Sequence, residues 1–100
     1  MIIGTTPTHK FTLPFDTNRI KNVHIIYAKD GEPIVVKEKD DCSFDGNVVS
    51  VTLTQEDTFL FKHNKRVEIQ IRTLDFNGRV LSSSIIIVRA SGCLENEVLV

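Results

Sequence analysis

The residues of this chain that most often carry chemistry are three histidines, two cysteines and one run of three serines. None of the histidines, His9, His24 and His63, stands at a metal-ligand spacing from another histidine or from a cysteine. Ser82–Ser84 lacks the Gly-x-Ser-x-Gly turn that exposes a nucleophilic serine after a strand. We therefore expect no catalytic residues, no metal ligands and no cofactor, and we expect that the protein is not an enzyme.

The two cysteines, Cys42 and Cys93, are also interpreted as structural residues. Their spacing matches no zinc or redox motif. Met1–Thr5 lacks the charged and apolar regions of a secretory signal, so both thiols are expected to be reduced in the cytoplasm of the producing cell. The sequence leaves open whether the two cysteines approach each other closely enough to form a disulfide.

The charge of the chain is almost balanced, with 12 basic and 13 acidic residues and a formal net charge of -1. The densest basic cluster, residues 62–66, follows the acidic residues Glu56 and Asp57, which partly cancel its field. A solvated loop is the favoured interpretation of this cluster, and a phosphate-binding patch is the alternative. Nucleic acid is not an expected partner. The longest apolar run has only four residues, so no membrane-spanning helix is expected either.

Three dipeptides that favour tight turns, Asp30-Gly31, Asp45-Gly46 and Asn77-Gly78, separate segments of strand-like pattern. Each is expected to close a β-hairpin. The expected strands are Val23–Ala28, Ile34–Lys39, Val48–Thr54, Arg66–Leu74 and Arg79–Arg89. Apolar and polar residues alternate most clearly in the third and fourth of these, which predicts one buried and one solvated face.

Two further elements complete the expected fold. Thr54 and Asp57 have the spacing of a capping box, which predicts one or two helical turns crossing between sheets, with an aromatic residue in the core. A strand at about His9–Leu13 is expected to end, or to lie at a sheet edge, because Pro14 follows it.

These elements predict an all-β protein, an immunoglobulin-like antiparallel β-sandwich of six or seven strands with one short helical turn. Residues 1–100 are expected to form a single domain with short flexible termini. The chain has no tryptophan and no Cys-Trp-Cys spacing, so a true immunoglobulin domain is not predicted.

The candidate interface residues are Ile85, Ile86, Ile87 and Val88, together with Phe76. The first four are apolar on both faces of their strand, so they should lie centrally in a sheet or pack against a neighbouring chain. Phe76 stands next to a hairpin tip and is the one aromatic candidate for an exposed contact, although packing within the turn is an equal alternative.

A resemblance to known proteins covers nearly the whole chain. The segments that carry it are Gly4–His9, Leu53–Thr58 and Val67–Arg72. With these segments, the chain resembles small uncharacterised proteins encoded in phages and prophages of Gram-positive bacteria. Leu53–Ile87 is also loosely similar in pattern to the immunoglobulin-like N-terminal domains of phage baseplate proteins. The resemblance implies a virion structural or assembly role in the tail, baseplate or head–tail region, and it carries over no functional residues.

Protein partners are therefore expected, through self-association or through contact with other virion proteins. The protein would act in the cytoplasm of the host bacterium during assembly, or within the virion. Apolar segments such as Met1–Ile3 and Val98–Val100 can add a strand to a neighbouring sheet. The alternative function is a small ligand- or glycan-binding β-sandwich module, against which the single tyrosine and the absence of tryptophan count.

Overall fold

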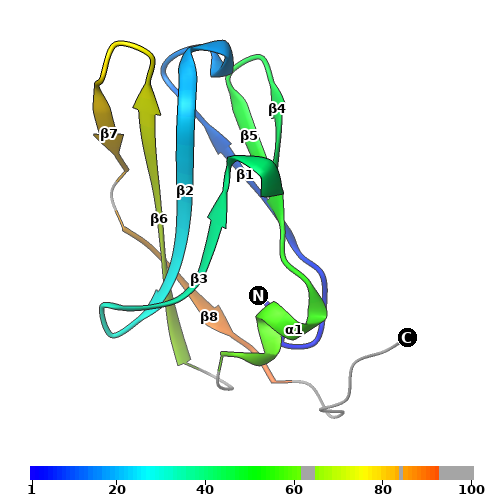
Figure 1. Cartoon of the computed structure of the whole chain (residues 1–100). Coiled ribbons are helices and arrows are strands. Elements are labelled where there is room, and N and C mark those ends of the chain that lie inside the picture. The colour runs from blue at the N-terminus through cyan, green and yellow to red at the C-terminus, as the bar shows by residue number, and fades with distance from the viewer. Residues whose placement is uncertain (62–64, 84, 93–100) are drawn as a thin grey trace.

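The computed structural model describes residues 1–61, 65–83 and 85–92. Two antiparallel sheets pack face to face (Figure 1), which confirms the predicted all-β sandwich. One sheet has the order β1-β5-β4; the other has the order β3-β2-β6, with β7 and β8 both paired to β6. The eight strands are β1 Thr8–Thr12, β2 Ile20–Lys29, β3 Glu32–Glu38, β4 Cys42–Asp45, β5 Val48–Thr52, β6 Lys65–Asp75, β7 Val80–Ser82 and β8 Ile86–Ala90.

The three predicted hairpins are present, and their turns have the backbone conformation that the turn dipeptides favour. Asp30 and Gly31 both have positive φ angles, 52° and 78°, as a tight turn between the twisted strands β2 and β3 requires. In the turn between β6 and β7, the Asp75 carboxylate accepts hydrogen bonds from the backbone N–H groups of Asn77 and Arg79.

The predicted helical turn is α1, Gln55–Phe59, and it carries the chain from one sheet to the other (Figure 1). The Thr54 hydroxyl accepts a hydrogen bond from the Asp57 N–H at 3.1 Å, and the Asp57 carboxylate accepts one from the Thr54 N–H at 2.9 Å. These two bonds confirm the capping box. Phe61, just after the helix, is buried in the core as the expected aromatic. Two short 3-10 turns, Thr17–Arg19 and Lys39–Asp41, were not predicted.

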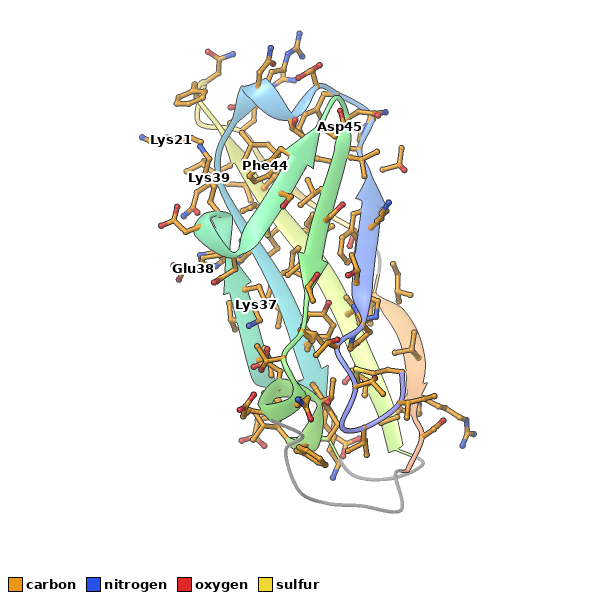
Figure 2. All side chains as sticks on the ribbon, turned by 90° about the vertical axis from the view of Figure 1, so that its right-hand side faces the viewer. Lys21, Lys37, Glu38, Lys39, Phe44 and Asp45 are labelled. Carbon is orange, nitrogen blue, oxygen red and sulfur yellow. The ribbon has the colours of Figure 1, made fainter. Side chains whose placement is uncertain are left out.

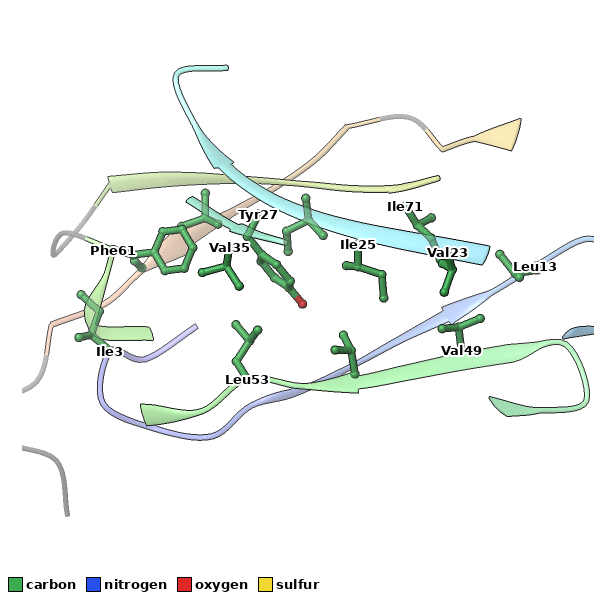
Figure 3. Packing of buried hydrophobic residues seen from close by; sticks show 14 of the residues in the cluster. Ile3, Leu13, Val23, Ile25, Tyr27, Val35, Val49, Leu53, Phe61 and Ile71 are labelled. Atoms are coloured by element: carbon green, nitrogen blue, oxygen red, sulfur yellow. The ribbon is translucent and has the colours of Figure 1, made fainter. Parts of the chain in front are cut away.

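The core lies between the two sheets, and the residues that fill it follow the alternation seen in the sequence (Figure 3). On β6, for example, Val67, Ile69 and Ile71 are buried, and their neighbours Glu68 and Gln70 are not. The buried cluster comprises Ile3, Leu13, Ile20, Val23, Ile25, Tyr27, Val35, Val49, Val51, Leu53, Phe61, Val67, Ile69, Ile71 and Ala90.

One polar contact crosses this core. Tyr27 is fully buried on β2, and its hydroxyl lies 2.6 Å from Nδ1 of His9 on β1, so the bond joins the two sheets. Burial raises the pKa of the tyrosine hydroxyl and keeps it un-ionised. Burial, together with the positive charge of the amino terminus, lowers the pKa of His9, so the folded protein favours the neutral imidazole.

We therefore expect His9 to make stability depend on pH. Because its pKa is lower in the folded state, its contribution is present above its ordinary pKa of 6.5 and is lost as the pH falls toward the folded value. The urea concentration at the unfolding midpoint of the native protein should therefore decrease as the pH is lowered from 7.5 to 5.5. His9→Asn, which retains an acceptor for Tyr27 but does not titrate, should flatten this slope. His24→Asn, at a half-exposed position on the outer face of the sheet, is the matched control. Equal slopes for the native protein and His9→Asn would contradict this expectation.

The position of the segment Ile85–Val88 excludes one of its two predicted alternatives, a central place in the sheet. It is not central: Ile86–Ala90 forms β8, which pairs with β6 alone among the described strands and therefore lies at a sheet edge. The expected single strand Arg79–Arg89 is also wrong, because the strand is interrupted after Ser82.

The interruption has a physical cause at Ser83. Its hydroxyl accepts a hydrogen bond from the Ile71 N–H, and its own N–H donates to the Ile71 carbonyl. Gln70 also donates from its side chain to the Ser83 carbonyl. A side chain thus takes the place of a ladder partner, and the chain leaves the regular strand before β8 resumes the pairing.

The N-terminal residues, expected as a flexible tail, instead pair with the end of β8. The Ile3 N–H donates to the Ser91 carbonyl at 2.9 Å, and the Ser91 N–H donates to the Met1 carbonyl at 2.8 Å. This short pairing is parallel, and Ile3 is buried. The basic cluster at residues 62–66 lies outside the described residues, apart from its last two, which begin β6.

Candidate functional site

Exposed apolar side chains gather on one stretch of the described chain. Ten large hydrophobic residues are exposed, and five of them fall within residues 80–87. We call these five the apolar edge: Val80, Leu81, Ile85, Ile86 and Ile87. They lie on β7, on β8 and on the link between them, at one margin of the five-stranded sheet (Figure 1).

Two members of the apolar edge point into the sandwich and yet remain exposed. Leu81 pairs with the buried Thr73, and Ile86 pairs with the buried Ile69, so each shares the inner face of the sheet with its partner. Their side chains are nevertheless 49% and 46% exposed. The facing sheet ends at β1, and no described strand beyond β1 covers them. The sandwich is therefore open along this side.

A groove of about 470 Å³ occupies the opening between β1 and the apolar edge. Its lining is mostly apolar and comes from three segments: residues 10–15 at and after β1, Ile71 and Thr73 on β6, and Leu81–Ser83 with Ile86. Lys10 is the only charged residue among them. The groove can accept an apolar chain and offers one cation at its rim.

On the side away from β5, the backbone of β1 presents hydrogen-bonding groups that no described strand pairs. The Leu13 N–H donates to Asn47 at 2.8 Å, and the Pro7 carbonyl accepts from Leu53 at 3.0 Å. Because pairing alternates along an antiparallel strand, the backbone groups of Thr8, Lys10 and Thr12 point away from β5. Among the described strands β1 pairs with β5 alone, so this edge is available to another strand.

The opposite margin of the sandwich has a different character. There the side chains around β3, β4 and the turn between them are largely charged, including Lys21, Lys37, Glu38, Lys39 and Asp45 (Figure 2). The Lys37 ammonium lies 2.7 Å from the Asp57 carboxylate and so ties β3 to the start of α1. Charged side chains at a margin disfavour strand addition, and none of the five residues of the apolar edge is charged.

The candidate interface residues named from the sequence do not all lie together in the structure. Ile85, Ile86 and Ile87 are exposed together, but Val88 is half-buried and packs against the core. Phe76 is 67% exposed, as expected, at the tip of the hairpin that follows β6. It therefore lies beyond the opposite end of β6 from the residues that pair with β8.

Phe76 stands instead beside a polar hollow of about 660 Å³ lined also by Asn18, Arg19, Asp75, Asn77 and Arg79. The Lys39 ammonium is 6.0 Å from the centre of the Phe76 ring. Such a distance allows a weak cation–π contact.

The residues with catalytic chemistry are not gathered in the described part of the chain. His9 is engaged with Tyr27, and His24 lies 3.9 Å from the Glu38 carboxylate on the outer face of the sheet. Among residues 1–61, 65–83 and 85–92, no three His, Cys, Asp or Glu side chains lie close enough to hold a metal ion. His63 and Cys93 lie outside these residues.

Cys42 has the environment of a structural thiol. Its Sγ donates a hydrogen bond to the Glu38 carbonyl at 3.3 Å. Burial, with the neighbouring Asp41 carboxylate, raises the pKa of the Cys42 thiol, so the reactive thiolate is disfavoured.

Sequence reasoning missed part of the site, namely Val80, Leu81 and the β1 side of the groove. Their alternation was visible, but it indicates only which side chains share a face. It does not indicate that the facing sheet stops at β1 and leaves inner residues uncovered.

The fold and the site together define a small antiparallel β-sandwich with one open, apolar edge. Comparisons of the chain with family models, with curated proteins and with solved structures gave no match in any of the three. No residue role is therefore carried over from another protein. No helix in the described ranges combines the length and apolar character needed to cross a membrane.

Proposed function

We propose that this protein is a non-enzymatic structural or assembly protein of a phage or prophage virion and acts through protein–protein contacts. The observation that carries the proposal is the apolar edge, where Leu81 and Ile86 are exposed on the inner face of the sheet margin and Ile85 and Ile87 on its outer face. Exposed apolar side chains gathered at one margin of a small domain are typical of an interaction site. The virion setting, in the tail, baseplate or head–tail region, rests on the resemblance to phage and prophage proteins.

The exposed strand edge gives a second argument for a contact surface. The five residues of the apolar edge include no charge and no proline, and an exposed apolar strand edge is a template for uncontrolled pairing. Burial of these side chains against a defined partner removes that hazard and stabilises the complex. Partners of the expected kind are other copies of the chain or other virion proteins.

The test replaces Ile85 and Ile87 together by aspartate. Ile87 pairs with Glu68 and Ile85 lies beside Gln70, so both side chains belong to the outer face and the core is left intact. In cells whose only copy of the gene encodes this variant, we expect the yield of intact particles to fall at least tenfold. The measurement is a count of purified particles, with mass spectrometry to detect the chain in them.

Leu60→Asp is the matched control, because Leu60 is also apolar and 58% exposed but follows α1 and lines neither the groove nor the outer-face hollow that Ile85 lines. It should leave the yield unchanged. A normal yield for the Ile85→Asp/Ile87→Asp variant, or particles and assembly intermediates that lack the chain, would refute the proposed function.

The polar hollow beside Phe76 favours one alternative, a small ligand- or glycan-binding module. An exposed aromatic ring with asparagine, aspartate and arginine side chains around it has the composition of a sugar-binding surface. However, the only tyrosine of the chain, Tyr27, is buried in the core. Glycan binding that Phe76→Ala abolishes, combined with a normal particle yield for Ile85→Asp/Ile87→Asp, would favour this alternative.

A further inference from the structure

The groove has the apolar lining and, along β1, the hydrogen-bonding groups of a site for one more strand. On one side, Thr8, Lys10 and Thr12 present backbone N–H and C=O groups away from β5. On the other side, Leu81 and Ile86 face inward without cover. An extended segment paired with β1 would widen the three-stranded sheet and place alternate side chains over these two residues.

Pairing of β1 with its own copy in the register centred on Lys10 is disfavoured. In an antiparallel pair formed by β1 of two copies and centred on Lys10, the two lysines would stand directly opposite each other and repel. Direct pairing of β8 with its copy is also restricted. The backbone of Arg89 and Ser91 already bonds to Met1–Ile3, which leaves only a short free stretch.

Residues 93–100 of the chain have the composition that the groove requires. They lie outside the described residues, and their sequence is Cys-Leu-Glu-Asn-Glu-Val-Leu-Val. In an extended conformation, one face would carry Leu94, Val98 and Val100 with the polar Asn96 among them, and the other face would carry Glu95 and Glu97 with Cys93 and Leu99. The apolar face matches the lining of the groove, and the acidic face matches Lys10, its only charged lining residue.

We propose that residues 93–100 of one copy add as a strand to β1 of a second copy and fill the groove under the apolar edge. This inference rests on the proposed function and names its partner, a second copy of the chain. In this arrangement the odd-numbered acidic residues lie on the outer face beside Lys10, because directly paired residues share a face. The even-numbered apolar residues lie over Leu81 and Ile86.

The test measures the mass of the full chain in solution by light scattering over a concentration series. We expect self-association from the 11.3 kDa monomer. Lys10→Glu should raise the apparent dissociation constant about tenfold, because it turns an attraction into a repulsion. Glu95→Lys with Glu97→Lys should do the same. Combining all three substitutions should restore association, since the charges are again opposite.

Lys21→Glu is the matched control, because Lys21 is exposed but does not line the groove. A synthetic peptide of residues 92–100, with serine at position 93, should compete and return the native chain to monomer. The readout is again the mass in solution.

Three results would overturn the inference. The native chain could be monomeric at every concentration, association could be insensitive to Lys10→Glu and to the peptide, or the combined variant could fail to recover. Each can occur while Ile85→Asp/Ile87→Asp still lowers particle yield. In that case the contact role stands and the partner segment is a different one.

Discussion

Replacing Ile69 by alanine is expected to lower the free energy of unfolding by about 2–5 kcal/mol. Ile69 lies on β6, the strand that pairs with β2, β7 and β8, and its side chain is only 3% exposed. Truncation removes apolar contacts and leaves a cavity between two sheets that are both held by backbone ladders. Urea-induced unfolding followed by circular dichroism measures the change, with an unaltered m value as evidence of two-state behaviour.

Ile85→Ala is the matched control, because it makes the same substitution next to β8 at a side chain that is 55% exposed. Its cost should be below about 1 kcal/mol at concentrations where the chain is monomeric. A loss below 1 kcal/mol for Ile69→Ala as well as for Ile71→Ala would contradict the assignment of these residues to the inner face of β6.

Asp57→Ala is expected to cost about 1–3 kcal/mol, because one carboxylate serves two structural functions. It accepts the capping bond from the Thr54 N–H, and it pairs with the Lys37 ammonium, whose side chain is only 16% exposed. Burial alone would raise the pKa of Asp57, but the hydrogen bonds from Lys37 and Thr54 outweigh it and lower the pKa. Its contribution is therefore present above the ordinary pKa of 3.8 and is lost as the pH falls toward the folded value.

The neighbouring Glu56→Ala provides the control, since Glu56 is exposed in the same helical turn and its side chain makes neither bond. Its effect should stay within about 0.5 kcal/mol. A double-mutant cycle of Asp57→Ala with Lys37→Met separates the ion pair from the cap. Equal losses for Asp57→Ala and Glu56→Ala at neutral pH would show that the contacts of Asp57 contribute nothing beyond helix propensity.

The sequence was informative wherever structure is specified by neighbours along the chain. Positive φ angles at Asp30 and Gly31 are a property of that dipeptide, and the capping box needs only Thr54 and Asp57. The alternation on β6 identified its buried face, because strand side chains have a period of two. Hairpins, helix and inner faces therefore followed from local chemistry.

The features that make up the site depend on residues far apart in the sequence. An apolar run such as Ile85–Val88 is compatible with a central strand or an edge strand, and only the number of strands in the sheet decides between them. The break at Ser83 depends on a hydroxyl that meets Ile71, twelve residues earlier. The contact between His9 and Tyr27 depends on which strands face each other across the core.

The parallel pairing of Met1–Ile3 with the end of β8 has a practical consequence for work with this protein. Because the two segments run in the same direction, any residues fused before Met1 continue alongside Val88 and Ile87. An amino-terminal purification tag would therefore extend along the apolar edge. It would compete there with the protein partner of this surface. Association measured on such a fusion would be weaker than that of the native chain, and removal of the tag would restore it.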